Sequence, residues 1–248
     1  MACPGAAGLA ALVKEFFERS DLWEAVCNSR YKYCRSFPIS GVLTKALLIH
    51  SGNQLDLFDG GGDKDQPLGP PPDNKQGWGR INLSNILSLP GINQFDLFVD
   101  DLVSIQDESR ITYNVEIPSS SLLPLIATIS WYDPPTVDGS TQNALIQDLD
   151  LIALSPTSKK YYSNNGQCLD NVNNNEKIVV ENPEAGVWSI VIKTKSLPYG
   201  SQLFSISITS GGSVVGVNKK EKDENKYDLD DVLDDIYTDD IGIDDDSN

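Results

Sequence analysis

The sequence is short of several residue types, and each shortage narrows the range of functions. It has one histidine, one methionine and four cysteines in 248 residues, and 19 basic residues against 36 acidic ones. The net charge of −17 argues against nucleic acid as a partner, because duplex binding depends on Lys and Arg side chains that contact phosphates. No run approaches the roughly 20 apolar residues that a helix needs to cross a bilayer, so we expect no membrane span. The opening residues also lack the pattern of a signal peptide, so the sequence itself leaves the localisation open.

The four cysteines do not form a metal-binding pattern. None of them shows the paired CxxC spacing that zinc sites use. Cys27 and Cys34, in "CNSRYKYC", are close enough in sequence to close a small disulfide loop in an exported protein. Free thiols are the alternative, and the spacing does not decide between the two.

The first half of the chain contains two helical patterns. Apolar residues at spacings of three, four, seven and eight predict a helix over residues 2–19; they are Leu9, Leu12, Val13, Phe16 and Phe17. Small residues fill its first turns, so another backbone can approach this end closely. A shorter pattern predicts a second helix over 42–50. The following stretch, "DGGGDKDQPLGPPPDNKQG", is too rich in Gly, Pro and Asp for regular structure.

From residue 95 the apolar pattern changes to the period of a β-strand. Six or more short runs rich in β-branched and aromatic residues are separated by turn clusters such as "SPTSKK" and "NPEAG". In one of them Phe204, Ile206 and Ile208 share one side of the strand, and polar residues share the other. No helical pattern lies between the runs. Residues 95–215 are therefore predicted to form an antiparallel β-sandwich.

The C-terminal residues have a different composition. Residues 219–248 hold thirteen acidic residues and four lysines. Runs such as "DLDDVLDDIYTDD" repel themselves and offer few apolar side chains to offset the cost of ordering. Residues 216–248 are predicted to be a disordered acidic tail, and an acidic docking segment is the alternative.

Several stretches, taken in order, resemble the subtilisin-like serine protease family. "MACPGAAGLAALV" resembles the end of the nucleophile motif GTSMA(T/C)PxxAG, in which the catalytic serine directly precedes the methionine. "VLTKALLIHSG" and "GWGRINLSNIL" are similar to the two elements that close that catalytic domain. "ISWYDPP", "LIQDLDLIALSP", "DNVNNNEKIVVENPEAGVWSI" and "LFSISITSG" resemble the jelly-roll domain that follows it in one branch of the family.

The resemblance implies a fold and a domain organisation. Residues 1–94 would be the C-terminal piece of an α/β subtilisin-like catalytic domain, consisting mainly of helices. Residues 95–215 would be an all-β jelly-roll sandwich, and 216–248 the acidic tail. In that family the helices of the first piece pack on a parallel sheet that lies upstream. Apolar residues of these helices are therefore expected to lack a burial partner here, namely Leu9, Val13, Phe16 and Leu47.

The resemblance also implies an activity whose catalytic residues lie outside the sequence. The nucleophile serine would immediately precede Met1, and the triad order Asp, His, Ser places the other two further upstream. The chain would be part of a secreted or vesicular serine endopeptidase acting on proteins or peptides, and inactive by itself. The sequon at Asn82 is compatible with export. His50 belongs to no nucleophile motif and is predicted to be a structural or surface histidine.

A different class of function remains as the alternative to a protease. The chain would then be a free-standing, non-catalytic β-sandwich module whose acidic tail binds a partner.

Acidic and amide side chains in the β region suggest a calcium site. Asp148 and Asp150 alternate along an apolar strand, so both point to the same side and repel each other unless a cation lies between them. Calcium binds oxygen ligands of this kind. The candidate ligands are Asp148, Asp150, Asp170, Asn171, Asn174 and Glu176, with Asn173 beside them. Calcium sites in the jelly-roll domain are also what the resemblance implies. The alternative is two solvent-facing aspartates and an asparagine-rich turn.

Overall fold

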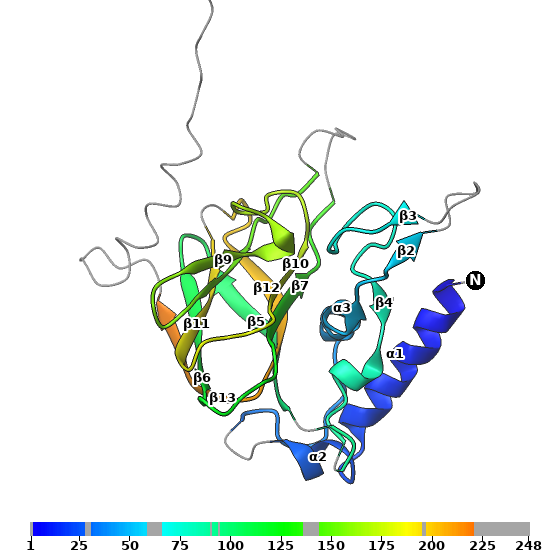
Figure 1. Ribbon diagram of the computed structural model, residues 1–248. Helices are drawn as coiled ribbons and strands as arrows, with labels where there is room; N and C mark the ends of the chain where they lie inside the picture. The colour runs from blue at the N-terminus through cyan, green and yellow to red at the C-terminus, as the bar shows by residue number, and fades with distance from the viewer. Residues whose placement is uncertain are drawn as a thin grey trace, which may run out of the picture.

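The protein is arranged in layers, and a computed structural model shows their order. Two β-sheets lie face to face, helix α3 (Gly41–His50) lies outside one of them, and helix α1 (Ala2–Glu18) lies beyond α3 (Figure 1). The structure describes residues 2–27, 31–58, 66–89, 91–93, 95–135, 144–194 and 197–220.

The N-terminal segment contains helices and two small strand pairs. The helices predicted over 2–19 and 42–50 are confirmed as α1 and α3. Ser40 caps α3, because its side-chain oxygen accepts a hydrogen bond from the Leu43 N–H at 3.0 Å. The remaining elements are α2 (Trp23–Val26), β1 (Gly52–Asn53), β2 (Leu57–Phe58), β3 (Gln66–Pro67), β4 (Arg80–Ile81) and the 3₁₀ turn η1 (Leu83–Asn85).

This composition does not support the prediction of a mainly helical piece of an α/β domain. Strand β1 pairs with β4 and β2 with β3, and both pairs are antiparallel. Irregular connections make up much of the rest of the described residues up to 93. The small antiparallel strand pairs were not predicted, because strands of two residues are too short to show an alternation of apolar and polar side chains.

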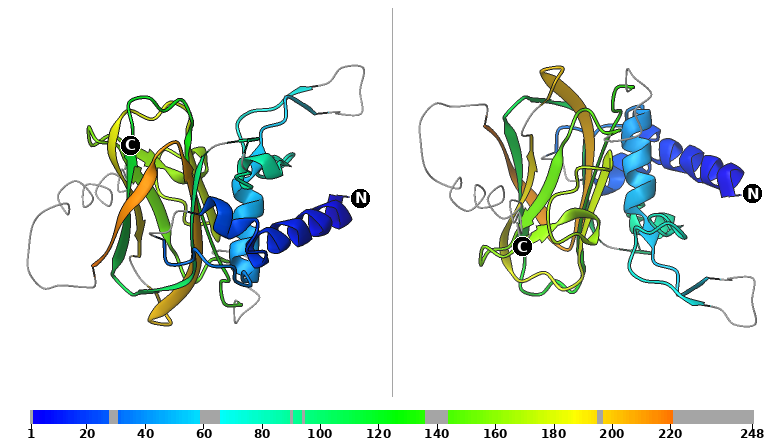
Figure 2. Two further views of the ribbon diagram at one scale, coloured as in Figure 1. Left: turned by 90° about the horizontal axis from the view of Figure 1, so that it is seen from below. Right: turned by 90° about the horizontal axis from the view of Figure 1, so that it is seen from above.

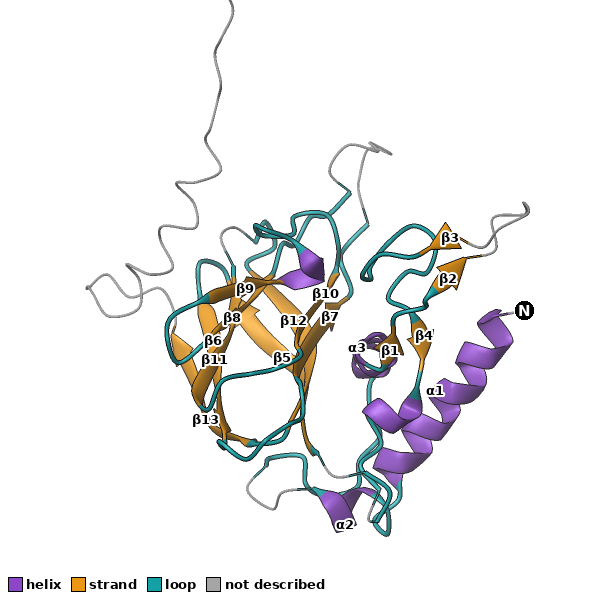
Figure 3. Ribbon diagram, viewed as in Figure 1, coloured by secondary structure: helices purple, strands orange, loops and turns teal. Residues whose placement is uncertain are grey.

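The second half of the chain forms the predicted β-sandwich. One sheet has the order β10-β7-β12-β5 and the other β13-β6-β11-β8-β9, with every pairing antiparallel (Figure 3). Its elements are β5 (Asp96–Gln106), β6 (Arg110–Ile117), β7 (Leu125–Trp131), β8 (Asp150–Leu154), β9 (Lys160–Tyr162), the turn η2 (Ser163–Asn165), β10 (Asn175–Val180), β11 (Gly186–Lys193), β12 (Ser201–Ser210) and β13 (Ser213–Lys220).

The predicted end of the sandwich at residue 215 is wrong. Strand β13 pairs with β6 as far as Lys220 opposite Arg110, so the folded region includes the predicted first residues of the tail. The remainder of the predicted tail, residues 221–248, lies outside the described residues.

Alternating side chains from both sheets fill the space between them. Four large aromatic side chains are fully buried there, and they are Tyr113, Trp131, Trp188 and Phe204. The two indole N–H groups donate to backbone carbonyls, Trp131 to Gln147 and Trp188 to Glu184, so burial leaves neither without an acceptor. Removing this apolar surface from water is the main driving force for folding of the sandwich.

A second core lies between the N-terminal helices and the sandwich. Leu97 and Val99 on the outer face of β5 pack in one cluster with Val13, Phe16 and Leu47. The expectation that these helical residues lack a burial partner is therefore wrong for Val13, Phe16 and Leu47, which are almost completely buried, whereas Leu9 is only half-buried. The sandwich, rather than a parallel sheet, covers this face. Figure 2 shows α3 lying between the sandwich and α1.

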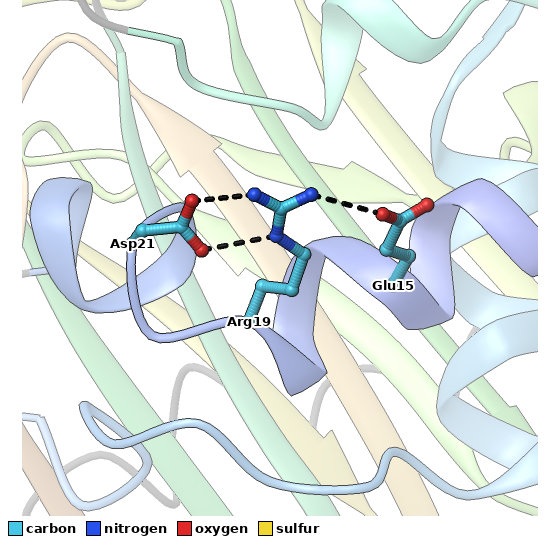
Figure 4. A network of polar contacts seen from close by, with 3 residues as sticks. All are labelled: Glu15, Arg19 and Asp21. Carbon is cyan, nitrogen blue, oxygen red and sulfur yellow. Dashed lines mark hydrogen bonds and ion pairs between the residues drawn. The ribbon is translucent and has the colours of Figure 1, made fainter.

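Ion pairs and a disulfide join the short connections of this segment. Arg19 contacts Glu15 at 3.1 Å and Asp21 at 2.5 Å, linking the end of α1 to the turn before α2 (Figure 4). These side chains are half exposed, so the pairs add little stability. Cys27 and Cys34 form a disulfide, which settles the alternative left open by their spacing. No described helix is long and apolar enough to cross a membrane, as the sequence predicts.

Candidate functional site

His50 occupies a structural position, as predicted, and it is completely buried. Its Nδ1 lies 3.0 Å from Ser207 Oγ and its Nε2 lies 2.8 Å from Thr209 Oγ1, both on strand β12. Burial, together with the positive charge of Lys177, lowers the pKa of the imidazole well below its ordinary value. Because the ring is buried and both of its nitrogens contact hydroxyl groups of this chain, it cannot contact a peptide substrate. We therefore assign it to the α3–sandwich contact.

Lys177 links β10 to the end of α3 through several hydrogen bonds. Its ammonium group donates hydrogen bonds to the carbonyls of Ile49, His50 and Gly52 at 3.2, 2.9 and 3.0 Å. These are carbonyls at a helix C-terminus, where a positive charge is favourable. Burial lowers the pKa of Lys177 to about 8.

Carboxylates gather at one end of the sandwich, where β8 and β10 from different sheets come together. Glu176 is completely buried, and its Oε2 accepts a hydrogen bond from the Leu151 N–H at 2.5 Å. Burial and the nearby Asp150 raise the pKa of Glu176 well above its ordinary value. Burial and the charges of Asp170 and Asp133 raise the pKa of Asp148 to about 6. Charge repulsion of this kind favours either a bound proton or a cation.

Some oxygens of this group lack a hydrogen-bond donor among the described residues. Asp148 Oδ1 and Glu176 Oε1 are buried and accept no hydrogen bond from that part of the chain. Orphaned carboxylate oxygens fit a hard cation such as calcium, which takes only oxygen ligands. In the described ranges, no three Asp, Glu, His or Cys side chains converge closely enough to hold a metal as they stand. An ion would therefore have to draw these carboxylates together.

The asparagine-rich loop contributes less to this group than its sequence suggests. Asp170 already accepts four hydrogen bonds, from the N–H groups of Val172 and Asn173 and the amides of Asn164 and Asn173. Asn174 accepts hydrogen bonds from Lys45 and from its neighbour Asn175 instead. The remaining predicted ligand of this loop, Asn171, is exposed. The turn interpretation therefore accounts for Asp170, Asn171 and Asn174, and the carboxylates of Asp148, Asp150 and Glu176 remain as candidate ligands.

Two residues at this end of the sandwich were not predicted. Asn164 has a φ of 52°, and its amide donates to Asp170 and to the Asn175 carbonyl, while its carbonyl oxygen accepts from the Lys177 N–H. Asp133 binds the N–H groups of residues 146 and 147. The turn sequence "SNNG" was the only signal for Asn164, because asparagine tolerates the left-handed conformation.

A cleft of about 1120 Å³ lies between the N-terminal segment and the sandwich. Its floor includes Ile126 and Val179 from the outer face of the four-stranded sheet, and Trp78 and Phe95 line one wall. Residues 159–162 and 165–167, in and around β9 and the turn after it, also line the cleft, as do Lys177 and Glu181 of β10 and the loop after it.

The first turns of α1 form a further unusual surface. Nearly all of residues 2–8 are exposed, and half of the Leu12 side chain is exposed as well. Gly5 and Gly8 lie inside this helix, and a Cβ atom placed on either would meet nothing within 4 Å. Glycine inside a helix costs about 1 kcal/mol relative to alanine. No contact within the described residues offsets that cost.

Comparisons with known proteins do not assign the chain to a family. No family model matches it, and no curated protein matches it. Among solved structures it is similar to the crystal structure of the Bacillus licheniformis lipase BlEst2 in its propeptide form, with 12% sequence identity and a TM-score of 0.29. That alignment covers 52% of this chain and 25% of the lipase chain, so this chain spans about a quarter of the length of the lipase. A likeness this weak carries no argument about fold or function.

Proposed function

We propose that this chain is the C-terminal part of a subtilisin-like serine endopeptidase. The N-terminal segment would be the end of the catalytic domain, and the sandwich would be the domain that follows it. Peptide hydrolysis would be carried out by an Asp, His and Ser triad encoded upstream, with the serine directly before Met1. The substrates would be proteins or peptides, and the enzyme would be secreted or vesicular.

The observation that carries this proposal is the exposed glycine-containing half of α1. Gly5 and Gly8 have open space where a side chain would lie, although alanine would make a more stable helix. Glycine at these two positions is explained if another backbone packs directly against the helix. In the nucleophile motif the corresponding helix is buried in the middle of the catalytic domain. A surface from that domain would cover residues 2–8.

The order of strands in the sandwich supports the jelly-roll part of the proposal. When β5 to β12 are numbered one to eight, one sheet holds strands one, eight, three and six from its β5 edge. The other sheet holds strands two, seven, four and five, with β13 added beside strand two. Jelly rolls consist of eight strands in two Greek keys, and this strand order is compatible with that arrangement.

Within such an enzyme, this chain would position other groups rather than perform the chemistry. The last turns of α1 are fixed by Val13, Phe16 and Phe17, which are anchored in the second core. The helix that begins with the nucleophile motif would in this way be held against the sandwich through α3. Calcium at Asp148, Asp150 and Glu176 would neutralise the buried carboxylates and stabilise that end of the sandwich.

One observation favours the alternative function, a non-catalytic binding module. Val13, Phe16 and Leu47 find burial partners inside the chain, so the N-terminal segment does not depend on an absent sheet for its core. The cleft beside the sandwich would then be the binding site of the module. The two functions differ in whether the first turns of α1 are covered by another part of the same protein.

An activity assay tests the enzymatic proposal on the chain as it is. The purified chain is expected to hydrolyse no peptide substrate, and a serine-directed phosphonate is expected to label no serine, because no triad is present. Stoichiometric labelling of a serine in this chain would contradict the assignment of its nucleophile to an upstream residue.

A further inference from the structure

The cleft between the N-terminal segment and the sandwich has an apolar floor. Ile126 on β7 and Val179 on β10 lie at opposed positions in the sheet and face away from the sandwich core. Val179 is 40% exposed, and Phe95 and Leu123 extend the apolar lining. The volume of about 1120 Å³ is slightly larger than that of typical small-molecule pockets, about 300–1,000 Å³. A segment of polymer therefore fits this space better than a small metabolite does.

The residues that line the cleft include three lysines and one carboxylate, namely Lys159, Lys160, Lys177 and Glu181. In the described part of the chain, neither Lys159 nor Lys160 has its ammonium group within 4 Å of a carboxylate. Lys159 instead lies over the ring of Tyr161, at 4.7 Å from the ring centroid. Lysines in excess of carboxylates are unexpected in a chain with a net charge of −17, although Lys159 also interacts electrostatically with Glu184. They indicate an occupant with carboxylate groups beside its apolar side chains.

Residues 221–248, here called the acidic segment, have this chemistry. They hold thirteen acidic residues and two lysines. Apolar side chains recur at the spacings i, i+3, i+4 and i+7, at Leu229, Val232, Leu233 and Ile236, with aspartates between them. At helical spacing these four side chains share one face and the aspartates lie on the other. An apolar face of this kind, set in a groove, is a common mode of peptide recognition.

The acidic segment is long enough to reach the cleft and small enough to enter it. Strand β13 ends at Lys220, four strand spacings from β9, which is about 19 Å. Eight residues lie between Lys220 and Leu229, and the nine steps along the chain span up to about 30 Å when extended. Two helical turns, about 10 Å across and 10 Å long, occupy roughly 800 Å³. The cleft volume of about 1120 Å³ accommodates them.

We propose that the acidic segment docks in the cleft of its own chain, with the apolar side chains of residues 229–236 on the floor and neighbouring aspartates at Lys159 and Lys160. Attachment to the same chain gives the segment an effective concentration in the millimolar range, so weak contacts are sufficient. The docked segment and any other acidic peptide would compete for the same space. This inference does not depend on the proteolytic proposal.

The two exposed cysteines provide a direct test on the full chain. Cys168 directly follows Gln167 in the lining of the cleft, whereas Cys3 lies on the exposed part of α1. A nitroxide spin label is attached to Cys168 in a Cys3→Ser variant, and to Cys3 in a Cys168→Ser variant as the control. The amide NMR signals of residues 229–236 are expected to lose most of their intensity with the first label and to keep it with the second.

Charge reversal then tests the residues that hold the segment. Lys159→Glu with Lys160→Glu is expected to restore the signals, and so is an ionic strength of about 1 M, where the Debye length is about 3 Å. Lys14→Glu, an exposed charge reversal on α1, is the matched control and is expected to change nothing. Leu233→Ser tests the segment side without altering the folded part.

Three results would overturn the proposal. Full intensity of the signals of residues 229–236 in the chain labelled at Cys168 at low salt would show that the acidic segment does not dock in the cleft. The cleft would then be a site for a partner from outside the chain. Equal losses from both labels would indicate a segment that samples the whole surface. A loss that persists after reversal of Lys159 and Lys160 would indicate docking elsewhere.

Discussion

Calcium is expected to raise the stability of the sandwich by relieving repulsion among its buried carboxylates. Asp148, Asp150 and Glu176 lie at one end of the sandwich, and Asp148 Oδ1 and Glu176 Oε1 accept no hydrogen bond from the described residues. An ion that binds only the folded state contributes about 2.7 kcal/mol at a hundredfold excess over its dissociation constant. For a domain of this size, that raises the melting midpoint by roughly 5–10 °C.

The same carboxylates favour the folded state of the calcium-free protein at mildly acid pH, and the buried His50 opposes them. The folded-state pKa of Asp148 is about 6 and its ordinary value is 3.8, so the folded state takes up a proton before the unfolded state does. The contribution of Asp148 to stability therefore rises as the pH falls from 7 toward 4, and Glu176 acts in the same direction, whereas the buried His50, whose folded-state pKa is lowered, lowers stability as the pH falls below about 6.5. We expect a gain of about 1 kcal/mol between pH 7 and pH 5 from Asp148, after allowing for the solvent that screens this partly exposed group.

Thermal melts with and without calcium, at pH 7.5 and pH 5, check both effects. Calcium is expected to stabilise at pH 7.5 and to lose most of its effect at pH 5, because protons then compete for the same oxygens. Asp148→Asn and Glu176→Gln should abolish the calcium shift, while Glu18→Gln on the exposed face of α1 should keep it. Identical melting midpoints with and without calcium at pH 7.5 would refute the reasoning.

Two substitutions test the packing of the N-terminal helices. Gly8→Ala is expected to stabilise the isolated chain by about 0.5–1 kcal/mol in thermal melts, because the added Cβ meets only open space. Gly79→Ala is the contrasting variant and is expected to destabilise the chain. Gly79 has a φ of +93°, and its added Cβ would lie 2.2 Å from the Asn53 carbonyl oxygen. A destabilising Gly8→Ala would mean that this chain itself covers the helix. Lys177→Met is expected to cost about 2 kcal/mol in denaturant melts, because three carbonyls at the end of α3 lose a charged donor. The half-buried Lys45, which makes one longer hydrogen bond, serves as the control, and an equal effect of Lys45→Met would show that the three bonds are not responsible.

Periodicity in the sequence predicted the elements with repeating apolar patterns. The spacing of Leu9, Val13 and Phe16 predicted α1, and the alternation in β12 placed Phe204, Ile206 and Ile208 together in the core. The predicted sandwich ended at residue 215, inside β13, because the pattern of "SVVGVNKK" is interrupted by glycine and ends in lysines. A strand at the edge of a sheet needs apolar residues on one face only, so its sequence signal is weak.

The contacts between elements could not be predicted in the same way. Ser205, Ser207 and Thr209 alternate with the core residues of β12 and have the pattern of a solvent-facing side, yet all three are buried. Helix α3 covers them, and the imidazole of His50 satisfies two of their hydroxyl groups. The local sequence shows which side chains are polar. Their hydrogen-bond partners, however, depend on packing between segments far apart in the chain, which the local sequence does not predict.

The coding sequence directly upstream of the Met1 codon tests the central claim, that this chain is part of a subtilisin-like serine endopeptidase. The account predicts an open frame that encodes Gly-Thr-Ser immediately before Met1, and a serine at that position that a phosphonate labels in the longer protein. An in-frame stop codon at that position would contradict the account and support the non-catalytic binding module.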